Sequence, residues 1–441
     1  MISKRKWMYG IGNAGAQFIW TFTGSFLTQY YTDSVVVSAA FIGTMMLVMR
    51  LADGITDIMQ GILIEKTNTR FGKARPWLII SIIPLLVTTV LVFNVPQSLS
   101  GTGKAIYICI TYFLMATVFY TMFSLGYWAM LPLVAGDSKE RAGLSSAANI
   151  CGFVSGTFIS VITVPVLNAL GGSTSQFAWR IVAVIFTLFA LVLTVACVIT
   201  TKENKKLKTD KAKPIRIKTS MRELLHTKYF YIAVGFAVCT SMIGAIVLGA
   251  PLFFARDVLG NSNYYAYLAL VYSLTTVVVI ALSPKLYDRF GKRRVMYMGC
   301  AIAILGRIAG IFNPYSLALT LVGTFITAVG MSMYTAGAWT LASEIVDFLE
   351  PRLGTRIEGL ATTATSFGNK VGTGFGAAAL GWALAYGGYD ASLPSQGIAV
   401  QKAEIFLLYF LPMVLCAISF FLIRAWKITT EKRLKPIQAI G

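Results

Sequence analysis

Long apolar runs separated by short polar connections recur along the whole chain. A helix needs about 20 apolar residues to cross the hydrocarbon core of a bilayer, so each run predicts one membrane span. Twelve spans are expected, at residues 8–32, 37–64, 76–95, 104–134, 144–170, 178–200, 229–254, 263–287, 295–312, 315–342, 357–386 and 403–425. The pattern therefore predicts an all-α membrane protein.

The composition supports this prediction, because 56% of the 441 residues are hydrophobic and only 13% are charged. A soluble core could not bury that much apolar surface. The chain starts with MISKRK, a short basic stretch before an apolar segment that is too long for the core of a signal peptide. We therefore expect the first segment to remain as a span.

The net charge of +20 comes from basic residues in alternate connections, most densely in residues 202–228. The connections on the other side contain only Lys104, Arg180, Arg256 and Lys402. Basic loops stay in the cytoplasm, so both termini are predicted to be cytoplasmic in a multi-pass protein of the plasma membrane. The basic excess thus sets orientation, and nucleic-acid binding is not expected.

A duplication is indicated by the hexapeptides RFGKAR, residues 70–75, and RFGKRR, residues 289–294, each of which follows the second span of its half. We expect six-helix bundles at residues 1–200 and 229–441, the second with a short cytoplasmic tail, joined by a polar linker at 201–228. Parallel repeats of six spans are typical of alternating-access carriers whose site lies near the midplane of the membrane.

The sequence has few of the residues that enzymes use for catalysis. Its only histidine, His226, lies in the basic linker, and its six cysteines are scattered singly through apolar segments. No His-based metal site or Ser/His or Cys/His catalytic arrangement can be assembled in the membrane from these residues. We expect neither an enzyme nor a protein with a cofactor or a structural metal.

Two aspartates interrupt the second predicted span. A spacing of four places Asp53 and Asp57 on one face of the helix, and Thr56 adds a hydroxyl oxygen. Ionised carboxylates at membrane depth must face the protein interior, and a close pair is relieved of its repulsion by binding Na⁺ or a proton. These residues are candidate cation ligands, unless Arg50, one turn earlier, neutralises an aspartate and only locks helices together.

A lone lysine, Lys370, lies in the polar stretch TATSFGNKVGTGFG of the eleventh predicted span. Its charge cannot face lipid at that depth. Lys370 is therefore a candidate functional residue, and the alternatives are that it extends to the membrane surface or pairs with Asp53 or Asp57.

The stretch RLADGITDIMQGILIEKTNTRFGKARPW, residues 50–77, closely resembles a signature of the glycoside–pentoside–hexuronide:cation symporters, which have the major facilitator fold of twelve helices. The resemblance continues through QYYTD at 29–33, YTMFSLGYWAMLP at 120–132, KERAGLSS at 139–146 and GTRIEGLATTATSFGNKVG at 354–372. It implies a secondary transporter that couples the symport of a sugar or glycoside to Na⁺ or H⁺.

The resemblance also implies roles for individual residues. Asp53 and Asp57 would bind the cation, together with the hydroxyl group of Thr121. The sugar site would draw on the following residues: Gln17, Ser124, Trp128, Trp339 and Lys370.

Departures from the family pattern concern the substrate. Gln17 and Ser124 replace aspartates that the melibiose permease of this family uses to bind sugar hydroxyl groups, and Asn149 lies where that protein has an arginine. An amide and a hydroxyl group can still bind a polyol. Loss of the acids also favours an anionic hexuronide, although a neutral oligosaccharide or pentoside stays equally open, as do Na⁺ and H⁺.

A cytoplasmic gate is expected where charged loops exchange ion pairs during transport. Its candidate residues are Arg70, Arg75, Asp288, Arg289, Arg294, Glu344, Asp347 and Glu358. The three acids at 344, 347 and 358 are equally consistent with ordinary charges at helix ends.

Two other functions fit a chain of this kind less well. A carrier of lysolipids or other amphiphiles would prefer an apolar path, against which Gln17, Ser124, Asn149 and Lys370 argue. A membrane sensor would need a folded soluble domain, which the sequence does not show. The expected partners are a small sugar or glycoside, a monovalent cation and the lipid bilayer, with no obligate protein partner.

Overall fold

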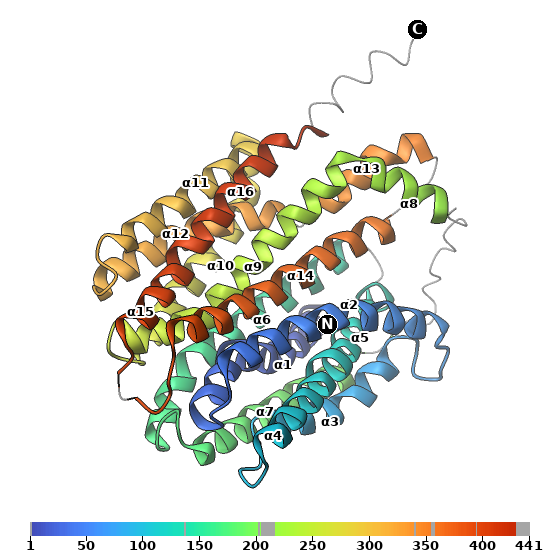
Figure 1. Ribbon diagram of the computed structural model, residues 1–441. Coiled ribbons are helices and arrows are strands. Elements are labelled where there is room, and N and C mark those ends of the chain that lie inside the picture. The colour runs from blue at the N-terminus through green and yellow to red at the C-terminus, as the bar shows by residue number, and fades with distance from the viewer. Residues whose placement is uncertain are drawn as a thin grey trace. The chain divides into compact units, whose positions relative to one another are not determined.

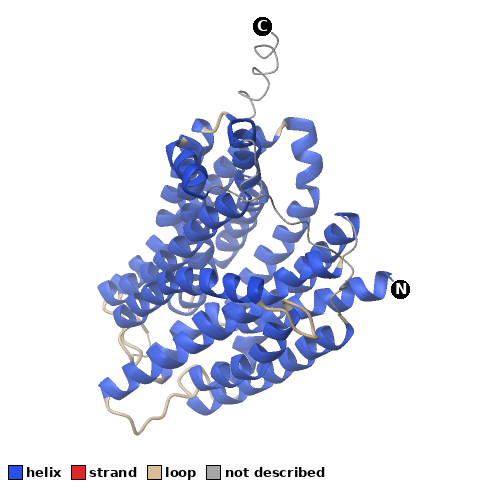
Figure 2. Ribbon diagram, turned by 90° about the vertical axis from the view of Figure 1, so that its right-hand side faces the viewer, coloured by secondary structure: helices blue, strands red, loops and turns tan. Residues whose placement is uncertain are grey.

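The computed structural model describes residues 2–135, 138–201, 203, 217–338, 341–353, 358–393 and 395–428. These residues form helices and loops, with no strand among them and only an isolated bridge between Thr69 and Gly72 (Figure 2). The predicted all-α class agrees with this structure. Figure 1 shows the order of the helices along the chain.

The described residues of the first half form seven α-helices and two π-helical segments. Their bounds are α1 Ile2–Gln29, η1 Tyr30–Ser34, α2 Ala39–Lys66, α3 Arg75–Val92, α4 Gly101–Tyr112, η2 Phe113–Phe119, α5 Tyr120–Val134, α6 Ser138–Ala169 and α7 Gln176–Thr200. The helical run from α4 through η2 to α5 is continuous, so it forms one long span.

In the described part of the second half, α8 and α13 lie almost entirely outside the predicted spans, and the other helices follow these spans. Their bounds are α8 Ile217–His226, α9 Lys228–Asp257, α10 Tyr264–Phe290, α11 Lys292–Ile311, α12 Leu317–Ala338, α13 Leu341–Leu353, α14 Glu358–Gly387, α15 Ile398–Ile405, η3 Phe406–Phe410 and α16 Leu411–Ala425.

Ten helices or continuous helical runs in the described part of the chain are long and apolar enough to cross a membrane. They coincide with ten of the twelve predicted spans. The other two predicted spans coincide with α1 and α14, which have 28 and 30 residues. The chain is thus a multi-pass membrane protein, and twelve crossings stay a prediction.

Contacts divide the chain into two compact units. Unit 1 consists of Met1–Thr209, Leu248–Leu270 and Ala377–Glu404, and unit 2 consists of Asp210–Val247, Val271–Gly376 and Ile405–Gly441. The end of α9, the start of α10, the end of α14 and most of α15 therefore pack with the helices of the first half. The predicted bundles at 1–200 and 229–441 follow the sequence repeat instead, and they stay a prediction.

In unit 1, α1 packs against α6 and α7, α3 packs against α5 and α7, and α2 packs against η2 and α5. The buried side chains around Phe22, Phe93 and Trp179 form an aromatic core in which the rings of Phe22 and Phe93 stack at 4.2 Å. This packing brings α1, α2 and α5 together, and these helices carry most of the predicted cation and sugar residues.

In unit 2, α11 lies alongside α12 and α16, as Figure 1 also shows. Glycines allow α11 and α12 to approach closely: a Cβ atom on Gly330 would lie 2.3 Å from the backbone nitrogen of Ala303. Small residues at such contacts are typical of helix packing in membranes, where close van der Waals contact replaces the hydrophobic drive for association.

The two repeated hexapeptides share one backbone feature. Gly72 and Gly291 have φ angles of +116° and +81°, a region that residues with a side chain rarely adopt. In both copies the glycine turns the chain between two helices, α2 and α3 in the first half and α10 and α11 in the second. The sequence repeat therefore corresponds to a repeated turn.

Candidate functional site

Asp53 lies on α2 with 5% of its surface exposed. The Arg50 guanidinium donates to one carboxylate oxygen at 3.2 Å, from Nη1 to Oδ2. The hydroxyl group of Thr121, on α5, donates to the other oxygen, Oδ1, at 3.2 Å. Each oxygen of this buried carboxylate therefore has a donor, and one of the two donors carries a positive charge.

Arg50 connects this carboxylate to two aromatic rings. Its guanidinium lies over the Trp20 ring of α1, 4.2 Å from the ring centroid, and the Trp20 ring stacks on Tyr120 of α5 at 4.9 Å. A cation over an aromatic face is attracted by the ring quadrupole. One charged side chain thus links α1, α2 and α5.

Asp57 lies one turn beyond Asp53 on α2 and is half-buried. Thr56 is also half-buried, and its hydroxyl group donates to the backbone carbonyl of Asp53 at 3.1 Å. The lone pairs of the Thr56 hydroxyl oxygen are not used by that bond. The four candidate cation ligands therefore lie on two adjacent helices, with Asp53 the most deeply buried of the carboxylates.

The candidate sugar residues of unit 1 lie on α1, α5 and α6. Gln17 is half-buried, and its Cγ atom lies 3.1 Å from the position that a Cβ atom on Gly152 of α6 would take. Thr121, Ser124 and Trp128 are spaced by three and four residues, so they share one face of α5. Trp128 is 36% exposed.

Asn149 is exposed on α6, next to the buried Ala148. The contact between α6 and α1 is made by another amide, the buried Asn13 of α1. Its side chain donates to the carbonyl oxygen of Ala148 at 2.9 Å. The structure therefore shows α1 and α6 joined through Asn13, which the sequence did not single out.

Unit 2 carries Lys370, which is half-buried on α14. Its neighbour Asn369 accepts a hydrogen bond from the Ser241 hydroxyl group of α9 at 2.8 Å. The candidate Trp339 and the side chain of the candidate Glu358 lie outside the described residues.

The backbone of the first charged loop, residues 70–75, binds the carboxylate of Glu203. The backbone N–H groups of Lys73, Ala74 and Arg75 donate to the carboxylate of Glu203 at 2.8, 2.9 and 2.7 Å. These groups lie at the start of α3, where a helix leaves N–H groups without partners and attracts negative charge. Glu203 thus caps α3 from the segment after α7.

The two arginine side chains of this loop do not contact Glu203 in any recorded hydrogen bond. Arg75 donates to the carbonyl oxygen of Val198 at 2.7 Å, and the exposed Arg70 lies over the ring of its neighbour Phe71. The two candidate gate residues of unit 1 therefore contact the chain near α7 and their own loop.

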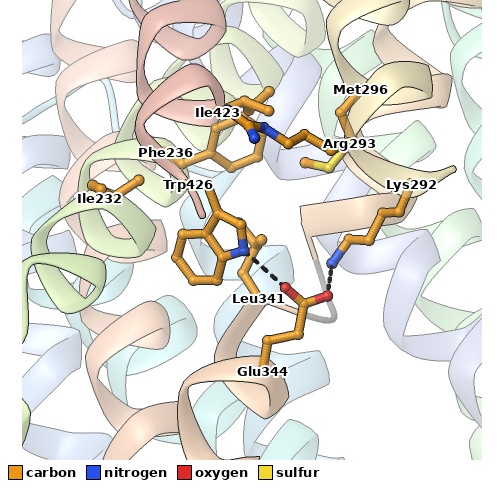
Figure 3. A pocket seen from close by; sticks show the side chains of 9 residues that line it. All are labelled: Ile232, Phe236, Lys292, Arg293, Met296, Leu341, Glu344, Ile423 and Trp426. Carbon is orange, nitrogen blue, oxygen red and sulfur yellow. Dashed lines mark hydrogen bonds and ion pairs between the residues drawn. The ribbon is translucent and has the colours of Figure 1, made fainter. Parts of the chain in front are cut away.

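In unit 2, a charged pair borders a small pocket between α9, α11, α13 and the end of α16. Glu344 accepts from Lys292 Nζ at 2.6 Å and from Trp426 Nε1 at 2.8 Å (Figure 3). The pocket is otherwise largely apolar, and it is lined by Ile232, Phe236, Lys292, Arg293, Met296, Leu341, Glu344, Ile423 and Trp426.

The other candidate gate residues of unit 2 lie close in sequence to Lys292 or to Glu344. Asp288, Arg289 and Arg294 are exposed, and the Arg289 guanidinium lies over Phe290. Asp347, on α13, is half-buried. The acid that the sequence placed in a gate, Glu344, thus pairs with Lys292, a basic residue of the second repeat that was not singled out.

The described residues contain no group of three or more His, Cys, Asp or Glu side chains that could hold a metal ion. The carboxylate and hydroxyl oxygens around Asp53 suit a proton or a hard monovalent cation.

Trp20 and Tyr120 are the main residues of this region that the sequence did not identify. Tyr120 is the first residue of the quoted YTMFSLGYWAMLP, and Trp20 follows Gln17 by three positions on α1. The helical spacing places Trp20 on the side of α1 that carries Gln17. That spacing was the available signal, but only the fold shows that Arg50 covers the ring.

Comparison with known proteins places the chain in a family. Residues 8–430 match the model of the MFS/sugar transport protein family. The putative glycoside/cation symporter YagG of Escherichia coli (strain K12) is 30% identical over 430 residues, which cover 97% of this chain and 93% of that protein. The isoprimeverose transporter of Lactiplantibacillus pentosus is 28% identical over 405 residues, with 91% and 84% covered.

Solved structures show the same fold. A bacterial homologue of the lysosomal transporter Spinster has a TM-score of 0.67 at 16% identity, with 96% of each chain covered. The D-xylose-proton symporter has a TM-score of 0.63 at 14% identity, with 95% of this chain and 96% of that chain covered. The predicted major facilitator fold is confirmed.

The resemblance to the glycoside–pentoside–hexuronide:cation symporters is confirmed by the named relatives, since one is a glycoside/cation symporter and another, 26% identical over 437 residues, is a glucuronide carrier homologue of Escherichia coli. Family membership also confirms a transporter instead of an enzyme. The chain belongs to the MFS/sugar transport protein family.

Proposed function

We propose that this protein is a secondary transporter that couples the symport of a sugar or glycoside to a monovalent cation, with Asp53 as the central cation ligand. One observation carries the proposal: a carboxylate on a membrane-spanning helix is 5% exposed and holds an arginine and a hydroxyl group from α5. Buried acids in membrane helices are expensive and are usually functional.

The cation would act by competing with Arg50. A proton or Na⁺ on Asp53 removes the negative charge that holds the guanidinium, and Thr121, Asp57 and Thr56 would supply further oxygens to Na⁺. Because Arg50 also lies over Trp20, its release would uncover an aromatic face. A pyranose ring could stack on that face, next to the amide of Gln17. Cation binding would thus prepare the sugar site.

The proposed sugar site also includes Ser124, Trp128 and Asn149 from unit 1, and Trp339 and Lys370 from the second half. Trp128 offers an exposed ring, and Ser124 shares its face of α5. Lys370 would add a positive charge that favours a carboxylate on the substrate. We infer that this site can bind a hexuronide or a neutral glycoside. Of the two, only the hexuronide has a carboxylate that Lys370 could bind.

In the proposed orientation both termini are cytoplasmic, because the basic connections lie on their side. The loops with Arg70, Arg75, Asp288, Arg289 and Arg294 would then form the cytoplasmic gate with Glu344, Asp347 and Glu358. The contact of Lys292 with Glu344 supports an ion-pair exchange in this region.

The alternative substrate class, lysolipids, receives less support. The relatives transport a glycoside, isoprimeverose or a glucuronide according to their names. The polar groups on α1 and α5 agree with a substrate rich in hydroxyl groups.

Uptake into proteoliposomes tests the proposal. A labelled methyl glycoside should accumulate when an inward Na⁺ or H⁺ gradient is imposed, and the ion whose gradient drives uptake identifies the coupling cation. Uptake that responds to neither gradient would contradict symport. In Asp53→Asn, accumulation should fall to equilibration while the variant still elutes as a folded monodisperse protein. Asp390→Asn, which changes an exposed carboxylate, is the matched control.

Substrate charge can be tested separately with Lys370→Ala. If Lys370 binds a carboxylate, uptake of methyl glucuronide should decrease more than uptake of methyl glucoside. Equal losses for the two sugars would remove the argument for a hexuronide and leave the symport proposal intact.

A further inference from the structure

A second group of buried charges lies in unit 1, apart from Asp53. Arg256, near the end of α9, donates from Nε and Nη2 to the two carboxylate oxygens of Asp257 at 2.7 and 2.8 Å. Its Nη1 atom donates to Asp33 of η1 at 2.6 Å. One guanidinium thus holds two carboxylates whose side chains are only 2% and 5% exposed.

Further donors complete the shell of Asp33. The Tyr389 hydroxyl group donates to Asp33 Oδ1 at 2.5 Å and accepts from Arg256 Nη2 at 2.6 Å. Burial, followed by the charge of Asp33, raises the pKa of Tyr389, so this phenol keeps its proton and remains a donor. Thr32 and Ser173 donate to the same carboxylate at 2.9 and 3.2 Å.

A third acid, Glu404 of α15, lies in this cluster without such a shell. It is 1% exposed, and neither carboxyl oxygen accepts a hydrogen bond from any described residue. Its charged neighbours are the carboxyl group of Asp257, which lies within hydrogen-bonding contact, and Arg256. Gln401, one turn earlier on α15, donates to the backbone carbonyl of Asp257 at 3.0 Å and holds the two helices together.

Charge balance decides the state of Glu404. Among the described residues, Asp257 and Arg256 of α9 are the charged groups next to Glu404, and Arg256 in turn contacts Asp33 of η1 and Tyr389 of the loop after α14. Arg256 is the only cation among them and is already shared by two carboxylates. An ionised Glu404 would be a buried charge with no donor, in contact with a like charge, which is unfavourable on both counts.

We propose that Glu404 and Asp257 form a proton-binding site, in which the Glu404 carboxyl group carries a proton at neutral pH and donates it to the Asp257 carboxylate. The proton supplies the hydrogen bond that no described side chain gives to Glu404. This site is separate from Asp53, and it does not depend on the proposed coupling mechanism.

A metal cation fits the same position poorly. Na⁺ prefers several oxygen ligands, but both Asp257 oxygens already accept from Arg256. Each Asp257 oxygen keeps one lone pair, which can accept a hydrogen bond from Glu404, but this does not make the shell of several oxygens that Na⁺ prefers, and the guanidinium would repel the ion. A proton needs a single donor and a single acceptor, which is what the two carboxyl groups provide.

The proton also preserves the contact between the elements of this cluster. If Glu404 lost it, two adjacent carboxylates would compete for Arg256, and the links from α9 to η1 and to Tyr389 would weaken. Alkaline pH should therefore loosen the segments around residues 30–37 and 389–404.

Infrared spectroscopy of the full-length protein in lipid vesicles tests the site directly. The wild type at neutral pH should show the C=O stretching band of a protonated carboxyl group, and the band should decrease as the pH is raised. Glu404→Gln should lack this component, and the exposed control Asp390→Asn should retain it. A wild-type spectrum that Glu404→Gln does not change would overturn the proposal, as would loss of the band on adding Na⁺ at constant pH.

A second variant tests the sharing of the proton. Asp257→Asn keeps Glu404 but removes the acceptor carboxylate and releases Arg256, so Glu404 should ionise and the neutral-pH band should be lost. Retention of the full band in Asp257→Asn would contradict a shared proton. Hydrogen exchange of residues 389–404, compared at the same alkaline pH, should be faster in the wild type than in Glu404→Gln, and equal rates would contradict the effect on the contact.

Discussion

Asp53 and Glu404 are both buried carboxyl groups in unit 1, but their surroundings differ. Asp53 accepts from Arg50 and from Thr121, one donor on each oxygen. Glu404 accepts from no described donor and lies against another acid. The comparison teaches that burial alone does not decide what a carboxyl group can do. Hydrogen-bond donors compensate Asp53, which suits an exchange of partners, whereas the lack of a described donor at Glu404 is the basis for the proposed proton.

The largest effect in this comparison is expected for Arg256→Gln. The substitution leaves Asp33 and Asp257 buried without their shared cation, and breaking a buried ion pair costs about 3–5 kcal/mol. The apparent melting temperature in detergent should fall further than it does when the Arg50 charge is removed. A loss no greater than that of a surface substitution such as Arg294→Gln would show that the cluster does not stabilise unit 1.

A smaller loss is expected for Arg50→Met, since one carboxylate is orphaned instead of two and Asp53 can take up a proton. The cost should approach the lower end of the same range, about 3 kcal/mol. The double variant Arg50→Met/Asp53→Asn should recover part of the loss, because it removes the unpaired charge. Additive losses in the double variant would contradict a direct Arg50–Asp53 interaction.

Trp20→Leu tests the link between Arg50 and the aromatic face. It removes a cation–π contact worth about 0.5–2 kcal/mol and keeps an apolar side chain at the position. Sugar uptake should decrease more than stability does, if the ring also receives the substrate. Wild-type transport in this variant would remove Trp20 from the proposed sugar site and leave the Arg50–Asp53 pair unaffected.

The smallest effect on stability is expected for Glu404→Gln at neutral pH. A neutral amide replaces a neutral acid of similar shape, so the melting temperature should stay near that of the wild type. Asp53→Asn should be clearly destabilised in the same assay, because it leaves the Arg50 cation without its carboxylate. A similar decrease in melting temperature for both variants would contradict the proposed difference in charge between the two acids.

Much of the fold could be predicted from the sequence because lipid imposes a length and an apolar composition on every span. The predicted ranges coincide with helices, and the turn glycine Gly291 has the left-handed backbone expected of a tight turn. Asp53 was identified because an acid within an apolar run has few explanations. Its pairing with Arg50 was foreseen as an alternative, and the helical spacing of three makes that contact local.

The second acid site could not be found in this way. Asp33 and Arg256 lie 223 residues apart, and nothing in the sequence around them predicts their contact. Glu404 precedes an apolar run and looks like an ordinary charge at the end of a span. Trp20 likewise resembles any aromatic residue of a membrane helix until Arg50 is seen above it.

The sequence by itself determined the spans, the repeated turn, the family and the presence of acids at membrane depth, because these follow from local composition and spacing. The tertiary structure alone decided which acid accepts hydrogen bonds on both oxygens and which accepts none from a described residue, because donors such as Thr121 are brought to a buried acid by folding. That difference assigns a proposed exchangeable cation site to Asp53 and a proposed proton site to Glu404.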